Sequence, residues 1–217
     1  MEDLGKAAWA FPLVGAVIGL ILVLARFVLV GPLPPLLAAV IIVGLWVVLT
    51  GGLHLDGWCD CCDALASSVD AERRLEILKD SRLGTFGALG LILLVTAKTA
   101  AVADDRLPVA MVFLAPVIGR GIMVLAARGA GHRGEGMAAQ FISGLDAGTV
   151  RWAAILGLAP AVIGGWRGII AAAVAYAGAL LFRRIAVKRL GAVNGDVMGA
   201  WCELGEVIVL IVGCMIW

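Results

Sequence analysis

One short stretch, GGLHLDGWCDCCDAL at residues 51–65, is dense in side chains that bind metals or move protons. Asp56, Asp60 and Asp63 are spaced i, i+4 and i+7, so a helix would place them on one face. Three carboxylates so close repel one another, and Mg²⁺, which bridges carboxylates to phosphates, would relieve the repulsion. The pattern predicts a Mg²⁺ site, and the alternative is a solvated helix face. His54 could be a general base, a hydrogen-bond donor to phosphate or a capped loop residue.

The cysteines of this stretch offer a competing metal site. Cys59, Cys61 and Cys62 could bind zinc together with His54. However, neighbouring positions on a helix point in different directions, so Cys61 and Cys62 cannot easily share one tetrahedral site with Cys59. We therefore interpret the three cysteines as reduced, half-buried filling residues.

A second stretch, RRLEILKDSRLGTFGALG at residues 73–90, carries basic residues just before a glycine-containing turn into an apolar run. Cationic side chains beside the free N–H groups of a helix start form an anion site. We predict that the phosphate-binding residues are Lys79, Ser81 and Arg82, with Asp80 and Arg82 also catalytic. Arg73 and Arg74 are expected to be anchors at the membrane surface.

A third stretch, NGDVMGAWCELGE at residues 194–206, brings a second acidic set. Asp196, Glu203 and Glu206 share one helix face, and we predict that they complete the metal site from across the bundle. The alternative is that these acids compensate buried Lys or Arg side chains.

Two cations lie inside apolar runs, where an unpaired charge is unfavourable. Arg120 lies near one end of its run, so we expect a bound phosphate as its partner. Lys98 is expected to pair with Asp104 or Asp105.

The surrounding elements must be membrane helices. Of the 217 residues, 62% are hydrophobic, more than one soluble core can bury. A spanning helix needs about 20 apolar residues, and the continuous runs argue against a β-barrel. The sequence therefore predicts an all-α polytopic membrane bundle in a single domain, residues 1–217, with about seven spans: Trp9–Val30, Pro32–Thr50, Phe86–Ala103, Leu107–Ala127, Val150–Trp166, Ile169–Phe182 and Val197–Trp217.

Charge placement predicts the orientation. With seven spans, most basic residues fall in the N-terminus and in the loops at 51–85, 128–149 and 183–196, so this side is expected to be cytoplasmic. All three polar stretches then enter from the cytoplasm. This layout favours an enzyme over a transporter, whose site would lie near the bilayer midplane.

The three stretches, in this order, resemble the signature segments of the cobalamin synthase family, also called adenosylcobinamide-GDP ribazoletransferase. The family's first segment usually reads close to GGLHxDGLADTADGL, and its third resembles TGDxLGAxxExxE. The residues that match are His54, Asp56, Gly57, Asp60, Asp63, Asp80, Ser81, Arg82, Gly84, Thr85, Gly87, Ala88, Gly195, Asp196, Gly199, Ala200, Glu203 and Glu206.

The departures from the family pattern are few. Cys59, Cys61 and Cys62 stand where the family has small residues, which supports the filling interpretation. Ala64 replaces a glycine and Asn194 a threonine. The sequence also begins almost at the first span, without much of the N-terminal stretch common in the family, so a substrate contact made there would be missing or replaced.

The resemblance implies a Mg²⁺-dependent enzyme of the inner membrane, with its active site facing the cytoplasm. It joins adenosylcobinamide-GDP to α-ribazole or its 5′-phosphate, giving adenosylcobalamin or its 5′-phosphate and GMP. Fitted to this chemistry, we expect a catalytic set of His54, Asp60, Asp80 and Arg82, a phosphate-binding set of Lys79, Ser81, Arg82 and Arg120, and a metal set of Asp56, Asp60, Asp63, Asp196, Glu203 and Glu206.

Other functions predict other features. The CDP-alcohol phosphotransferases also line membrane helices with aspartates, but the sequence lacks their D-x-x-D-G-x-x-A-R pattern. A metal or anion transporter would use the same carboxylates at mid-membrane, in broken helices. A structural subunit would leave the charged clusters without a role. The expected partners are the two substrates and the lipid bilayer, with no nucleic acid, and the sequence does not fix the oligomeric state.

Overall fold

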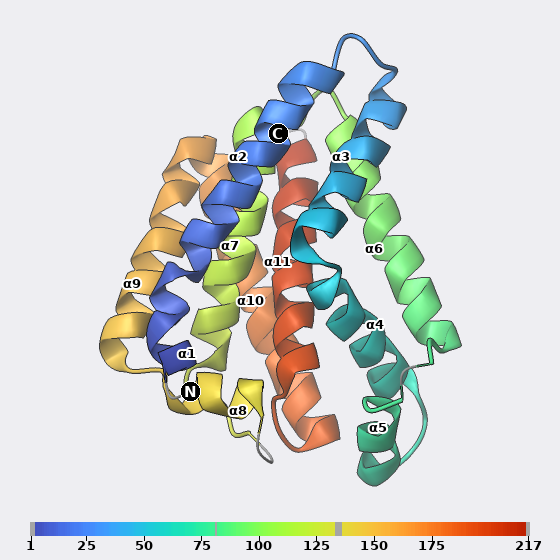
Figure 1. Cartoon of the computed structure of the whole chain (residues 1–217), viewed down its shortest axis with the longest axis vertical. Coiled ribbons are helices and arrows are strands. Elements are labelled where there is room, and N and C mark those ends of the chain that lie inside the picture. The colour runs from blue at the N-terminus through green and yellow to red at the C-terminus, as the bar shows by residue number, and fades with distance from the viewer. Residues whose placement is uncertain (1–2, 81, 133–135, 216–217) are drawn as a thin grey trace.

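The computed structural model describes residues 3–80, 82–132 and 136–215, so the expected phosphate ligand Ser81 lies outside the described residues. The described chain is a helical bundle without a β-sheet, which confirms the predicted all-α class (Figure 1). Its elements are α1 (Asp3–Lys6), η1 (Ala7–Ala10), α2 (Phe11–Leu29), α3 (Pro35–Thr50), α4 (Leu53–Ala66), α5 (Ala71–Ile77), α6 (Thr85–Ala103), α7 (Val109–Ala127), α8 (Met137–Ser143), α9 (Ala147–Leu158), η2 (Ala159–Gly164), α10 (Gly165–Leu190) and α11 (Gly195–Cys214).

Each predicted span corresponds to a helix of the bundle. Among the described residues, five helical stretches are long and apolar enough to cross a membrane, or six if α3 and α4 form one broken span. One of the five stretches runs from Ala147 to Leu190, and Figure 1 shows it folding back between α9 and α10. It therefore contains both the fifth and the sixth predicted spans.

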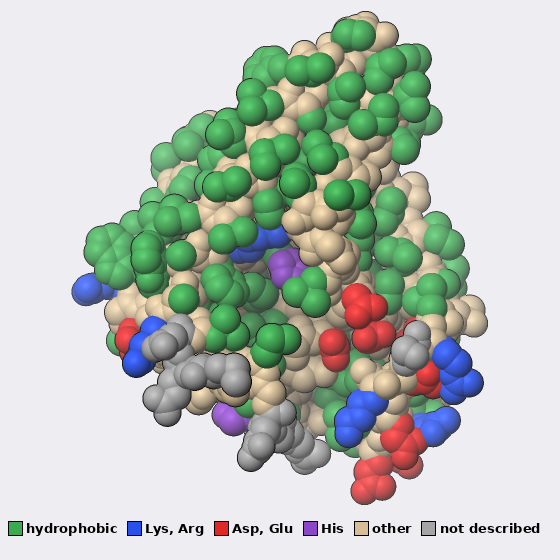
Figure 2. Space-filling view, in the orientation of Figure 1, with side chains coloured by type: hydrophobic (Ala, Val, Ile, Leu, Met, Phe, Trp, Pro, Cys, Tyr) green, Lys and Arg blue, Asp and Glu red, His purple; other side chains and the backbone are tan. Residues whose placement is uncertain are grey.

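Helices α7 and α11 form the centre of the bundle. Both are buried along most of their length, and α7 packs against α2, α11 and α9. The outer helices expose large apolar side chains instead, such as Phe27 at 70% and Val48 at 76%. This pattern fits helices that face lipid hydrocarbon. Figure 2 shows apolar side chains over most of the visible surface and charged side chains gathered at the lower end.

That lower end, which holds α5, α8 and the turn between α10 and α11, is called the polar end below. The second and third polar sequence stretches begin there, and the first stretch runs toward it along α4. The predicted loop at 183–196, however, is wrong in its first half. Helix α10 continues to Leu190, and Gly191 ends it with a left-handed φ of 80°. Residues 183–190 contain no Gly or Pro, so nothing breaks the helix before Gly191. In this added part of α10, the Arg183 guanidinium caps the end of α7 by donating to the carbonyls of Ala126, Arg128 and Gly129 at 2.8–3.0 Å.

A sharp bend between α3 and α4 sets the direction of the aspartate-bearing helix. The two helices meet at 94°. The bend consists of Gly51 and Gly52, with φ of 62° and 69°, values that residues with a β-carbon rarely adopt. Helix α4 therefore leaves the line of α3 and runs obliquely toward the polar end (Figure 1).

Candidate active site

Two glycines bring α4 and α11 into backbone contact. A β-carbon on Gly57 would lie 2.8 Å from the Asp196 carbonyl oxygen. One on Gly199 would lie 3.2 Å from the His54 α-carbon. Both glycines belong to the matching motifs, but their sequence positions alone do not reveal this close helix contact. Their effect is to place the aspartates of α4 beside the first turn of α11.

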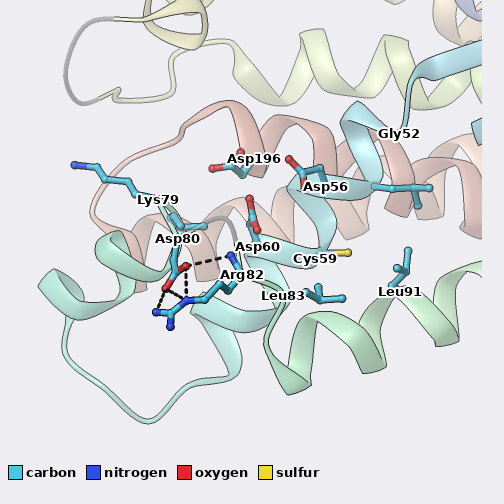
Figure 3. Close-up of a pocket in the computed structure, with 12 residues that line it drawn as sticks. Gly52, Asp56, Cys59, Asp60, Lys79, Asp80, Arg82, Leu83, Leu91 and Asp196 are labelled. Carbon is cyan, nitrogen blue, oxygen red and sulfur yellow. Dashed lines mark hydrogen bonds and ion pairs between the residues drawn. The ribbon is translucent and has the colours of Figure 1, made fainter.

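An acidic cavity of about 600 Å³ lies at this crossing (Figure 3). Asp56 and Asp60 enter it from α4, and Asp196 enters it from α11. Figure 3 shows the three carboxylates gathered on one side of the cavity. In the described part of the chain, no Lys or Arg forms an ion pair with any of them. Asp196 accepts a hydrogen bond from the Asn194 amide at 2.7 Å. The cavity thus gathers three carboxylates, none of which is paired with a cation of the described residues.

The opposite wall comes from the segment between α5 and α6. It contains Lys79, Asp80 and Arg82, three of the predicted phosphate-binding and catalytic residues. Arg82 holds Asp80 in a two-pronged ion pair, with Nε to Oδ1 at 2.9 Å and Nη2 to Oδ2 at 2.6 Å. These hydrogen bonds lower the pKa of Asp80 to about 2. Asp80 is therefore a weak proton acceptor at neutral pH, and its carboxylate is paired with the Arg82 guanidinium.

Asp63 has a structural role that its spacing did not reveal. Its carboxylate oxygens accept the backbone N–H groups of Gly84 and Gly87, both at 2.8 Å, at the start of α6. A β-carbon on either glycine would lie within 2.4 Å of this carboxylate. Asp63 is also buried and does not line the acidic cavity. We correct its assignment from metal ligand to cap of α6.

We also correct the assignment of Glu203 and Glu206 as metal ligands. Both are buried in an ion-pair cluster with Lys98 and Arg120. Lys98 Nζ lies 2.5 Å from an oxygen of each glutamate, and Arg120 Nη1 lies 2.7 Å from Glu206 Oε1. The alternative interpretation, acids that compensate buried cations, therefore describes this cluster.

The same cluster corrects two expectations about the cations. Arg120 is occupied by Glu206 and does not line the acidic cavity, so it is not a phosphate ligand there. Lys98 does not pair with Asp104 or Asp105, and Asp104 pairs instead with Arg106 at 2.5 Å. In addition, Lys98 lies 4.3 Å from the ring centre of Trp46.

His54 lies on the other side of α4. It lines a separate cavity of about 320 Å³, with Arg120 and apolar residues of α2, α3 and α7. Its Nδ1 atom is buried and has no hydrogen-bond partner among the residues that the structure describes. Because His54 does not line the acidic cavity, the structure does not support it as the general base there.

The cysteines behave as filling residues. Cys59 and Cys61 are buried, all three cysteines of α4 are unbonded, and Cys62 packs close to Gly90 of α6. Only Cys59 lines the acidic cavity.

The acidic cavity suits a metal ion that takes only some of its ligands from protein. Among the described residues, no three His, Cys, Asp or Glu side chains are placed to hold an ion by themselves. Asp56, Asp60 and Asp196 nevertheless face one cavity and have no cationic partner in the described chain. Mg²⁺ is commonly bound by one or two carboxylates, with water and substrate phosphates as the other ligands. The donor set therefore fits Mg²⁺ bound together with a phosphorylated substrate.

The fold and the cavity define a class: a polytopic helical membrane protein with a polar site of carboxylates and an arginine at one end of the bundle. The comparisons then identify the family. The model of the cobalamin-5-phosphate synthase family matches residues 1–214, and the chain belongs to this family.

Several curated proteins are similar over nearly the whole chain. The adenosylcobinamide-GDP ribazoletransferase of Pseudomonas putida is 38% identical over 216 residues, covering 97% of this chain and 88% of that protein. The protein of the same name from Syntrophobacter fumaroxidans is 38% identical over 217 residues, covering 96% and 86%. That of Brevibacillus brevis is 36% identical over 207 residues, covering 93% and 84%. No solved structure matches the chain.

Proposed function

We propose that this protein is the transferase that joins adenosylcobinamide-GDP to α-ribazole or its 5′-phosphate, releasing GMP, at the acidic cavity. The observation that carries the proposal is convergence: segments of the three family motifs, far apart in sequence, line one cavity. Family membership and the names of the relatives support this identity of the two substrates. A pyrophosphate bond is the kind of substrate that such an acidic cavity handles with a divalent cation.

The chemistry is a displacement at phosphorus. A ribose hydroxyl of the acceptor bonds to the phosphorus that carries cobinamide, the bridging P–O bond breaks, and GMP leaves with the bridging oxygen. Bound Mg²⁺ would neutralise charge on the pyrophosphate. Asp56, Asp60 and Asp196 would hold it, and one of these carboxylates would take the hydroxyl proton. Arg82 and Lys79 at the rim would steady the phosphates.

The same proposal fixes an orientation. The basic residues of α5 and of the end of α10 lie at the polar end, and the positive-inside rule favours a cytoplasmic location for this end. We propose an inner-membrane enzyme whose acidic cavity opens to the cytoplasm. The bend between α3 and α4 is a feature that transporters share, but the aspartates follow the bend and lie toward the polar end. This placement favours an enzyme.

Product formation tests the proposal directly. Purified protein in detergent, given adenosylcobinamide-GDP, α-ribazole 5′-phosphate and Mg²⁺, is expected to release GMP and the new cobalamin in equal amounts. Both products should be followed, because GMP alone would also appear on simple hydrolysis. A folded sample that forms neither product overturns the proposal.

The helix crossing predicts a sensitive position. Gly57→Leu is expected to push α4 away from α11 and lower the rate of cobalamin formation by roughly 100-fold, because small displacements of catalytic groups have effects of this size. The matched control is Gly44→Leu on α3, where a β-carbon would meet no atom within 4 Å. Steady-state rates of the two purified variants check the prediction. Equal rates would show that the crossing does not position the aspartates.

A further inference from the structure

A second cavity continues from the acidic cavity along the polar end. It has a volume of about 330 Å³, at the lower end of the range for small-molecule sites, roughly 300–1,000 Å³. It lies between α5 and the turn that joins α10 to α11. We call it the leucine cavity, and its lining is Leu75, Leu78, Lys79, Leu190, Ala192, Val193, Asn194 and Asp196. Leu78, Lys79 and Asp196 line both cavities, so the two are adjacent.

The walls of the leucine cavity are mainly apolar. Leu75 of α5 and Leu78, the residue that follows α5, form one wall, and Leu190, Ala192 and Val193 contribute from the opposite side. Leu190 and Val193 are almost fully buried, at 1% exposure each, so this wall is fixed by packing. The charged groups, Lys79 and Asp196, belong to the border with the acidic cavity.

The remaining polar groups of this wall are already engaged. The Asn194 side chain accepts the Val197 N–H at 3.1 Å and donates to Asp196 at 2.7 Å. The backbone N–H of Val193 donates to the Gly131 carbonyl at 2.9 Å. A ligand group deep in the cavity therefore meets apolar surface and few free hydrogen-bonding side chains.

We propose that the leucine cavity binds the flat, apolar heterocyclic base of the acceptor nucleoside and so selects which base is accepted. This inference rests on the proposed function. The benzimidazole ring of ribazole lacks exocyclic donors, so apolar walls suit it. Guanine, the other base in the reaction, carries an exocyclic amine and a carbonyl, and each group buried without a partner costs about 1–3 kcal/mol.

The position of the cavity agrees with the reaction. Asp196 lies on the border, so a nucleoside with its base among the leucines would place its ribose beside Asp196 and its reacting hydroxyl in the acidic cavity. Lys79, also on the border, would lie near a 5′-phosphate. The guanosine of the donor then extends elsewhere from the acidic cavity.

Narrowing the cavity tests the inference. Ala192→Leu is expected to raise the KM for α-ribazole 5′-phosphate at least about 10-fold, because pocket changes of one methylene already have effects of 10- to 200-fold. The KM for adenosylcobinamide-GDP should change less than about twofold. The KM of the smaller acceptor that carries unsubstituted benzimidazole should rise by a smaller factor than the KM of α-ribazole 5′-phosphate, whose benzimidazole carries two methyl groups. The matched control is Ala71→Leu, an exposed position at the start of α5 outside both cavities.

Equilibrium binding separates this inference from the proposed function. Without donor, the dissociation constant of α-ribazole 5′-phosphate should be at least about 10-fold higher for the Ala192→Leu protein than for the unsubstituted protein. Because no donor is present, this result does not depend on whether the protein forms product. Equal binding by both proteins overturns the inference, and so does a rise in KM confined to the donor, which would place the donor's guanosine in the cavity. Absence of product together with weakened acceptor binding would overturn the proposed reaction but leave the binding site standing.

Discussion

Asp60→Asn is expected to lower the rate of cobalamin formation by about 1,000-fold while the protein stays folded. Asp60 faces the acidic cavity, and its carboxylate has no hydrogen-bond or ion-pair partner in the described chain, so the amide removes charge without breaking a contact. Losing one carboxylate from a metal and phosphate site removes several kcal/mol of transition-state stabilisation, and about 4 kcal/mol corresponds to a factor of about 1,000 in rate. The measurement is the steady-state rate at saturating substrates.

Asp63→Asn is the matched comparison, because it makes the same change three residues later on the same helix. Its carboxylate accepts two backbone N–H groups of α6, and an amide can accept with only one of its two polar atoms. This variant is expected to melt at lower temperature and to keep its activity per folded molecule. A large loss of activity in folded Asp63→Asn protein, or little loss in Asp60→Asn protein, would contradict the division of roles between the two aspartates.

Removal of divalent metal is expected to abolish product formation, and added Mg²⁺ to restore it. Three carboxylates without a cationic partner in the described chain would repel the substrate's pyrophosphate, and Lys79 and Arg82 lie only at the rim. The experiment incubates the enzyme with EDTA, removes the chelator and titrates Mg²⁺ while both products are followed. Asp196→Asn should raise the Mg²⁺ concentration for half-maximal rate roughly 10-fold or more.

The cysteine-rich character of α4 supplies a control for this titration. If thiolates held the metal, Cys59→Ser would shift the Mg²⁺ titration and Zn²⁺ would replace Mg²⁺ as the better activator. We expect neither result. Full activity after chelation would show that the basic rim alone neutralises the pyrophosphate, and the metal proposal would fail.

The fold and the centre of the site could be predicted from the sequence because they depend on local patterns. Long apolar runs define membrane helices, and the spacing of Asp56 and Asp60 on one helix face is fixed by helical geometry. The distribution of basic residues predicted that the polar stretches share one end of the bundle, and Asp196 meets Asp56 and Asp60 in one cavity toward that end.

The remaining assignments depend on contacts between residues distant in sequence. Asp60 and Asp63 look equivalent in sequence, and only the N–H groups of Gly84 and Gly87 distinguish them. The partner of Glu203 is Lys98, 105 positions earlier, and no periodicity encodes that pairing. His54 is the exception, because it lies two positions before Asp56 in α4 and helical geometry alone places the two side chains on opposite faces.

The ion-pair cluster has a consequence for biogenesis. Lys98 and Arg120 belong to α6 and α7, which leave the ribosome well before Glu203 and Glu206 of α11. Inserting a lysine or arginine at the centre of a helix costs about 2.5–3.5 kcal/mol each on translocon scales. The nascent bundle therefore carries these two cations without their carboxylate partners until α11 arrives. Helix α11 supplies both counter-charges at once, which makes its docking the step that neutralises the buried cations.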